Sequence, residues 1–201
     1  MHKLLLATNN KAKVREYQRL LQGIPYELVT LAELGIAMVV DEAGGSLEEN
    51  ARLKATVLAA ESQLLSLADD SGLEVDALGG APGPLSARYA GEGASDIERI
   101  NYLLARLKDV PWEKRTARFR CVIAIATPDK KVELCPGECR GFITLEPKGD
   151  HGFGYDPVFY LPELDKTMAE LPMELKNQMS HRGQAAGKAR EVLKKLSILP
   201  K

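Results

Sequence analysis

Short apolar runs along the chain predict buried strands, because a strand that is covered on both faces shows little polar alternation. The stretch 115–127 alternates at first and then becomes continuously apolar, as expected for a central strand. A turn signal, Pro128-Asp129-Lys130, follows it and predicts that the chain from Val132 pairs back as a hairpin. The expected strands cover residues 4–7, 26–31, 64–68 and 115–127, with the hairpin partner after them.

Helices are predicted where apolar residues recur every three or four positions behind a polar capping residue. Three pairs have the spacing of a capping box: Ser46 with Glu49, Ser95 with Glu98, and Thr167 with Glu170. The expected helices cover residues 11–22, 46–63, 95–107 and the stretch after Ser180. Strands that alternate with helices, together with one hairpin, predict an α/β fold with a mixed sheet, in one domain of residues 1–201.

Composition narrows the classes of function. The 201 residues are 45% hydrophobic and 27% charged, with a formal net charge of −1. These values are ordinary for a globular protein, and they give no sign of the basic face that nucleic acid requires. No apolar stretch approaches the roughly 20 residues of a membrane span, so we expect a cytoplasmic protein. The odd number of cysteines, Cys121, Cys135 and Cys139, predicts reduced thiols.

Two adjacent carboxylates directly follow the apolar run 64–68, in the sequence Asp69-Asp70-Ser71-Gly72. We interpret this tetrapeptide as a turn at the carboxyl end of a buried strand, where open α/β sheets bind ligands. Paired carboxylates there are unfavourable without a cation, and Mg²⁺ is the natural partner of carboxylate and phosphate oxygens. One of them could accept a proton from an attacking water. Because all four residues favour turns, a turn without chemistry stays the alternative.

Positive side chains at two predicted helix starts point to a bound anion. A helix N-terminus is the positive end of the helix dipole, so cations there are unfavourable unless an anion such as phosphate neutralises them. The residues concerned are Thr8, Asn9, Asn10, Lys11 and Lys13 at one start, and His181 and Arg182 at the other. The spacing of a P-loop is absent, and solvated surface cations remain the alternative.

A glycine-rich stretch, His151-Gly152-Phe153-Gly154-Tyr155-Asp156-Pro157, offers two aromatic rings beside flexible backbone. Such a loop can present a flat face to a nucleobase, with Gly152 and Gly154 allowing close approach of the backbone. Asp156 could accept hydrogen bonds from the ligand. A plain turn with aromatic core residues is the alternative reading.

Five segments together resemble the non-canonical purine nucleoside triphosphate pyrophosphatases, also called inosine triphosphate pyrophosphatases. They are LLLATNNKAK (4–13), LEENARLKA (47–55), ADDSGLEVDALGGAPGPLSARYAG (68–91), GFGYDPVF (152–159) and SHRGQA (180–185), in the order of the family. The resemblance implies an elongated mixed sheet flanked by helices, in two lobes with the active-site cleft between them. It also implies hydrolysis of ITP, dITP and XTP to the monophosphate and pyrophosphate, a Mg²⁺ requirement and a homodimer.

The same resemblance implies roles for individual residues. Asp70 should accept the proton and, with Glu42, bind the metal, while Ser71 touches the substrate. The triphosphate should be held by Thr8, Asn10 and Lys13, with Asn9 in the same turn and Lys54 as a weaker candidate. The nucleoside should be bounded by Phe153, Gly154, Tyr155 and Asp156, with Lys176, His181 and Arg182 reading base and phosphate.

Two other functions stay open at this point. One is a pyrophosphatase that acts on other nucleotides, including pyrimidine or modified ones, which a panel of substrates would separate. The other is a nucleotide-binding regulator without turnover. The intact pair of Asp69 and Asp70 argues against the regulator, because binding alone needs no proton acceptor.

Overall fold

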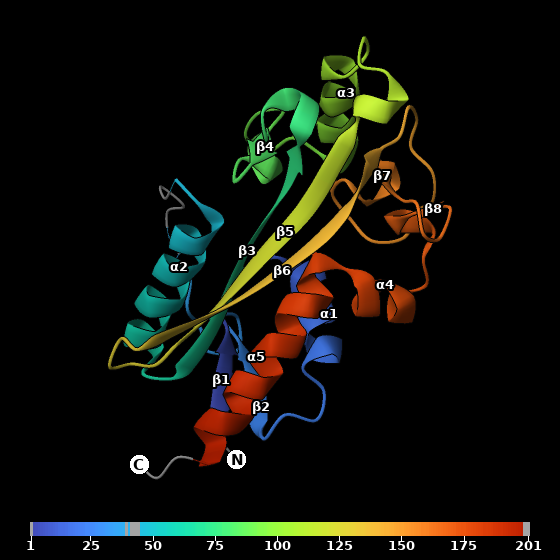
Figure 1. Ribbon diagram of the computed structural model, residues 1–201. Helices are drawn as coiled ribbons and strands as arrows, with labels where there is room; N and C mark the ends of the chain where they lie inside the picture. The colour runs from blue at the N-terminus through green and yellow to red at the C-terminus, as the bar shows by residue number, and fades with distance from the viewer. Residues whose placement is uncertain (1, 39, 41–44, 199–201) are drawn as a thin grey trace. The chain divides into compact units, whose positions relative to one another are not determined.

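The computed structural model describes residues 2–38, 40 and 45–198 (Figure 1). The chain divides into two compact units. Unit 1 holds Met1–Asp70, Cys121–Gly137 and Arg182–Lys201, and unit 2 holds Ser71–Arg120 and Glu138–His181. The long strands β3 (Leu65–Val75), β5 (Thr116–Ala126) and β6 (Val132–Ile143) contribute residues to both units.

The strands of the described residues form one mixed sheet in the order β2-β1-β3-β5-β6-β7-β8, with β4 paired to β3. Strand β1 is parallel to β2 and β3, whereas β4, β7 and β8 pair antiparallel to their neighbours. The remaining strands are β1 (His2–Leu6), β2 (Tyr26–Thr30), β4 (Pro82–Gly83), β7 (Phe159–Leu161) and β8 (Lys166–Thr167). The expected α/β fold with a mixed sheet and a β5–β6 hairpin is confirmed.

In unit 1, helices cover both faces of the sheet, which explains the continuous apolar runs (Figure 1). Leu4 and Leu6 pack in a core with α1 (Lys11–Leu20) and α5 (His181–Ile198). Leu5, between them in sequence, packs in a second core with α2 (Leu47–Ser62). Successive strand residues point to opposite faces, so one strand supplies both cores.

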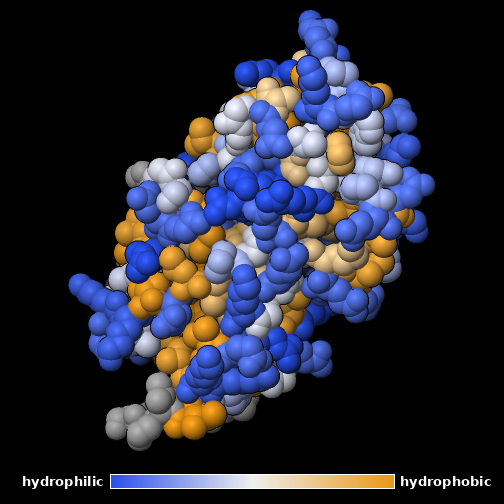
Figure 2. All heavy atoms as spheres, in the orientation of Figure 1, coloured by the Kyte–Doolittle hydropathy of each residue, from blue (hydrophilic) through white to orange (hydrophobic). Residues whose placement is uncertain are grey.

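In unit 2, one face of the sheet is apolar and the other is charged. Residues of α3 (Asp96–Arg106) pack with apolar positions of β3, β5 and β6. On the charged face, Arg118 Nη2 lies 2.6 Å from Glu74 Oε2. This difference accounts for the polar alternation at the start of β5. Figure 2 shows that hydrophilic side chains cover most of one face of the molecule, with smaller hydrophobic areas between them.

Two of the three expected capping boxes form. Ser95 and Glu98 cap α3, and Thr167 and Glu170 cap a short 3₁₀ turn, Met168–Glu170. At α2, Ser46 accepts from the Glu49 N–H as expected, but the Glu49 carboxylate accepts from Gly45 N at 2.9 Å. A further helix, α4 (Met173–Met179), was not expected. No helix of the described segments is long and apolar enough to cross a membrane.

The turn expected at Asp69-Asp70-Ser71-Gly72 is wrong, because β3 runs through all four residues to Val75. It then pairs with β4, with Leu73 opposite Gly83. Gly72 marks a close approach to this neighbour, since a Cβ there would collide with the Gly83 carbonyl. The strand continues through a polar sequence because both aspartates find basic or amide partners, so tertiary contacts override the turn propensity.

Candidate active site

Asp69 and Asp70 lie in the middle of β3, and their carboxylates point to opposite faces of the sheet. Leu67, two residues before Asp69, belongs to the core beneath α1 and α5. Ala68, two residues before Asp70, belongs to the core beneath α2. Both aspartates are buried. The two carboxylates therefore do not form one acidic cluster, and each must be compensated by its own surroundings.

Asp69 lies between the starts of α1 and α5. Its Oδ2 is 2.9 Å from Lys13 Nζ and 3.7 Å from Arg182 Nε. Burial by itself raises the pKa of the Asp69 carboxyl, but the charges of Lys13, Arg182 and Lys54 outweigh it and hold the pKa well below its ordinary value. Asp69 is therefore a permanent anion at neutral pH.

Arg182 has a second carboxylate partner in Glu16 of α1. Arg182 Nη1 donates to Glu16 Oε2 at 2.7 Å, and both side chains are buried. Burial lowers the pKa of the Arg182 guanidinium, but Glu16 and Asp69 raise it well above its ordinary value. Lys13 and Arg182, one from each helix start, therefore have carboxylate partners within the chain. The sequence alone predicts a bound anion at these helix starts and gives no sign of Glu16, one turn of helix beyond Lys13.

Asp70 faces α2, which supplies two polar partners. Asn50 Nδ2 donates to Asp70 Oδ2 at 2.9 Å. Lys54 Nζ lies 3.7 Å from Asp70 Oδ1 and donates to the Asp69 carbonyl at 2.7 Å. Asn50 and Lys54 are four residues apart, so they share one face of the helix. Lys54 is among the residues expected from the sequence and Asn50 is not, although the spacing of four between them was the available signal.

The turn of Thr8, Asn9 and Asn10 sets the direction of α1. Asn10 is the N-cap residue, and its Oδ1 accepts from Ala12 N at 2.9 Å and from Lys13 N at 3.2 Å. Thr8 Oγ1 accepts from Asn10 N at 3.2 Å. Asn9 and Asn10 are exposed, whereas the Lys13 side chain extends to Asp69. Polar groups and a cation are thus gathered at the start of α1.

In unit 2, the glycine-rich loop forms around the carboxylate of Asp156. Asp156 Oδ2 accepts from Phe153 N at 3.0 Å and pairs with Lys176 Nζ at 2.7 Å. Lys176, on α4, also lies 5.2 Å from the centre of the Phe153 ring, a cation–π distance. Gly152 has a φ of +80°, and a Cβ there would collide with Asp156 Oδ2. The fold therefore brings together Phe153, Asp156 and Lys176, as expected.

Two further bonds fix the loop to the rest of unit 2. Gly154 N donates to Asp96 Oδ2 at 2.7 Å, and the buried Tyr155 hydroxyl donates to the Ser86 carbonyl at 2.8 Å. Burial raises the pKa of the Tyr155 phenol well above its ordinary value. The Tyr155 side chain thus anchors the loop. Asp96 and Ser86 were not singled out from the sequence.

His181 is the first residue of α5 and is buried in unit 2. Its ring stacks on Phe119, with centroids 4.6 Å apart and planes 13° apart. Phe119 in turn contacts Phe159, with centroids 4.4 Å apart. Ser71, also assigned to unit 2, is a half-buried residue of β3. Glu42, the expected second metal ligand, and its neighbour Asp41 lie outside the described residues.

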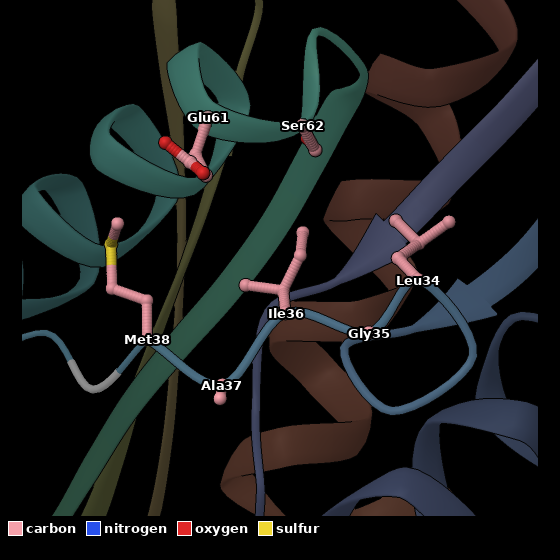
Figure 3. A pocket seen from close by; sticks show the side chains of 7 residues that line it. All are labelled: Leu34, Gly35, Ile36, Ala37, Met38, Glu61 and Ser62. Carbon is pink, nitrogen blue, oxygen red and sulfur yellow. The ribbon is translucent and has the colours of Figure 1, made fainter.

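A separate pocket in unit 1 has a volume of about 450 Å³ (Figure 3). It is lined by Leu34, Gly35, Ile36, Ala37, Met38, Glu61 and Ser62. Ile36 and Met38 extend from the segment after β2 toward the end of α2. None of the residues expected to bind the nucleotide lines this pocket.

Comparison with known proteins gives matches over nearly the whole chain. The model of the Ham1 family matches residues 4–192. A protein of Desulforamulus reducens named dITP/XTP pyrophosphatase is 52% identical over 196 residues, 98% of each chain. A protein of the same name from Bacillus subtilis is 44% identical over 199 residues, which cover 99% of this chain and 97% of the relative.

Solved structures agree with these matches. A HAM1 protein from Coxiella burnetii superposes with a TM-score of 0.89 at 41% identity, covering 97% of this chain and 100% of that chain. The Ham1 protein of Staphylococcus aureus gives a TM-score of 0.87 at 41% identity, covering 96% and 99%. The similarity therefore extends over the residues of both units described above.

Proposed function

Because this chain belongs to the Ham1 family, we propose that it hydrolyses dITP, ITP and XTP to the nucleoside monophosphate and pyrophosphate, and so cleanses the nucleotide pool. The names of relatives at 52% and 44% identity support this substrate class. The structural observation that carries the proposal is the buried Asp70 carboxylate, fixed by Asn50 and flanked by Lys54. An acceptor beside a cation is the pair that water attack on a phosphate anhydride needs.

We propose Mg²⁺ as the cofactor, with Asp70 as a ligand. Mg²⁺ is typically held by one or two carboxylates together with phosphate oxygens of the substrate. Within the described segments, no group of three or more His, Cys, Asp or Glu side chains gathers at one place. The buried Asp70 carboxylate supplies a hard oxygen donor for such a site, and we propose Glu42 and the substrate phosphates as the other ligands. When bound, the metal would neutralise charge on the phosphates.

The residues of unit 1 have separate parts in the reaction. Asp70 accepts a proton from the water whose oxygen bonds to the α-phosphorus, and the bond from that phosphorus to the bridging oxygen breaks. The bridging oxygen leaves with pyrophosphate. Lys13 and Lys54 stabilise the negative charge of the triphosphate, and the groups of Thr8, Asn9 and Asn10 bind its oxygens. Asp69 holds Lys13 in place and takes no proton, because its pKa is low.

The residues of unit 2 bind the nucleoside. Phe153 presents its ring to the base, and the backbone of Gly154, Tyr155 and Asp156 bounds the sugar and base. Lys176 can only donate hydrogen bonds, so it suits a 6-oxo group and would face another donor in a 6-amino purine. Ser71 and His181 of unit 2 and Arg182 of unit 1 make the remaining contacts with the nucleotide.

We also propose that the enzyme is a cytoplasmic homodimer that acts on free nucleotides and on neither nucleic acid nor membranes. The formal net charge of −1 agrees with a small anionic ligand bound locally rather than a basic face for nucleic acid. Light scattering of the purified chain gives the mass in solution directly. A monomeric mass at the protein concentration of the activity assay would contradict the dimer. It would not bear on the proposed reaction, which is tested separately.

A substrate panel tests the proposed reaction. Purified protein with Mg²⁺ is given dITP, XTP, dATP, dGTP, dCTP and dTTP, and pyrophosphate and orthophosphate are detected separately. We expect pyrophosphate from dITP and XTP at a kcat/KM at least roughly 100-fold above that for dATP, since a site built for a substrate hydrogen bond rejects an analogue without it. Preference for a pyrimidine or another modified nucleotide would favour the rival pyrophosphatase. Tight nucleotide binding without release of pyrophosphate would favour a regulator.

A further inference from the structure

The first turn of α3 contains two acidic residues, Asp96 and Glu98, whose carboxylates bind different backbone groups. Glu98 completes the capping box with Ser95, and its carboxylate accepts from Ser95 N at 2.7 Å. Asp96, two residues earlier, does not take part in this box. Its Oδ2 accepts from Gly154 N at 2.7 Å, 58 residues away in sequence. The Asp96 carboxylate therefore serves the glycine-rich loop, while the helix end is capped by its neighbours.

Asp96 is itself held by the side chain of Arg99. Arg99 Nη2 donates to Asp96 Oδ1. Arg99 Nη1 donates to the carbonyls of Ala87, at 2.9 Å, and Ala94, at 2.5 Å. These bonds fix the guanidinium against the backbone that precedes α3. The carboxylate that Gly154 meets is thus oriented before the loop binds anything.

The bond from Gly154 is one of two that orient Phe153. Phe153 N donates to Asp156 Oδ2 at 3.0 Å, and the next N–H along the chain, that of Gly154, donates to Asp96. The N–H groups on both sides of the Phe153 α-carbon are therefore fixed by carboxylates. The direction of the Phe153 side chain follows from the backbone that these bonds hold, with the ring 5.2 Å from Lys176 Nζ.

We propose that Asp96 is a positioning residue for nucleotide binding. It fixes the Phe153–Gly154 backbone, so that the Phe153 ring and Lys176 are already oriented to contact the base. This inference rests on the proposed function for the identity of the ligand, whereas the anchoring of the loop stands on the contacts of the free protein. Without the Asp96 carboxylate, the Gly154 N–H would lose its partner and the loop would sample other conformations before binding. Binding then becomes weaker while the chemistry at Asp70 stays unchanged.

The experiment compares Asp96→Ala and Asp96→Asn with Glu98→Ala as the matched control in the same turn. Hydrogen exchange of the free protein reports the loop directly, and kcat and KM for dITP report its use. For Asp96→Ala we expect faster exchange in residues 152–156, and a KM raised roughly tenfold with kcat within about twofold of wild type. Asp96→Asn keeps an acceptor oxygen, so its loop exchange and its KM should lie between those of wild type and Asp96→Ala. Glu98→Ala should lower the melting temperature and leave loop exchange and KM unchanged.

Two outcomes would overturn the proposal. One is wild-type loop exchange and KM in Asp96→Ala. The other is an equal rise in KM in Glu98→Ala, which would show that the stability of α3 alone is responsible. Because the exchange measurement uses no nucleotide, it separates this proposal from the proposed function: an inactive wild type would refute the reaction, and exchange would still decide whether Asp96 holds the loop.

Discussion

Asp69 and Asp70 are adjacent on β3, yet their carboxylates meet different cations. Lys13 Nζ lies 2.9 Å from Asp69 Oδ2, and Lys54 Nζ lies 3.7 Å from Asp70 Oδ1. The alternation of the strand directs Asp69 toward α1 and α5, and Asp70 toward α2. Asp69 is enclosed by charges that keep it ionised, whereas Asp70 is fixed by the neutral amide of Asn50. We therefore expect replacement of Asp69 to affect stability and disturbance of Asp70 to affect catalysis.

Replacing Asp69 by Asn should destabilise the protein strongly. The substitution removes the carboxylate that faces Lys13 and Arg182, and removing one partner of a buried ion pair typically costs about 3–5 kcal/mol. Urea denaturation at pH 7 measures this loss. Asp129→Asn is a matched control, because Asp129 pairs with Lys131 at an exposed turn, and its midpoint should equal that of wild type. Equal midpoints for both variants would contradict the assigned role of Asp69.

The same carboxylate should make stability depend on acidity. Since the folded protein lowers the pKa of Asp69, its stabilisation is complete above the pKa of the unfolded state, near 4, and is lost as the pH falls toward the folded value. Melting temperatures between pH 5 and pH 2 should therefore fall more steeply for wild type than for Asp69→Asn. Parallel curves would mean that Asp69 has an ordinary pKa in the folded state.

Replacing Asn50 by Ala should lower kcat and leave the KM for dITP nearly unchanged. Asn50 donates to Asp70 Oδ2 and fixes its orientation, and loss of an orienting hydrogen bond to a reacting group typically costs roughly 10- to 100-fold in rate. Steady-state kinetics of pyrophosphate release measures both constants. Arg52→Ala, at an exposed position of the same helix, is the control. A raised KM with normal kcat would instead assign Asn50 to substrate binding.

Replacing Gly152 by Ala should impair nucleotide binding. The new Cβ would collide with Asp156 Oδ2, and the residue has a φ of +80°, which alanine adopts poorly. Gly79 also has a positive φ, of +64°, but has no atoms within 4 Å of a built Cβ. Gly79→Ala therefore carries the backbone strain without the collision. Calorimetric titration with dITP should show weaker binding for Gly152→Ala than for Gly79→Ala. Equal affinities would mean that the close contact of Gly152 with the Asp156 carboxylate is not needed for binding.

The fold could be predicted from the sequence where burial leaves a recognisable pattern of apolar residues. Leu4, Leu5 and Leu6 read as a buried strand because helices cover both faces of it. The end of β3 could not be predicted in this way, since Asp69 and Asp70 look like turn residues until Lys13, 56 residues away, is seen to pair with Asp69. The helix α4 has seven residues and no side-chain N-cap, so it gave no start signal.

Many residues of the candidate site could be predicted from the sequence, but the contacts between them could not. The sequence pointed to Lys13, Asp70 and the glycine-rich loop, because cations at helix starts, adjacent carboxylates after an apolar run and aromatic residues between glycines are unusual patterns. It did not point to Asn50 or Asp96, since an amide in a helix and an acid in a first helical turn are common. Their importance arises only from the fold, which places them at Asp70 and at the Gly154 N–H.

The proposed reaction depends on Asp70, which we propose accepts the proton when water attacks the α-phosphorus. Pyrophosphate release from dITP with Mg²⁺, measured for wild type and Asp70→Asn with nucleotide binding checked by calorimetry, tests it most directly. We predict that turnover falls at least roughly 100-fold, the usual share of a general base, while the variant stays folded and still binds nucleotide. Turnover of Asp70→Asn at the wild-type rate would contradict the account.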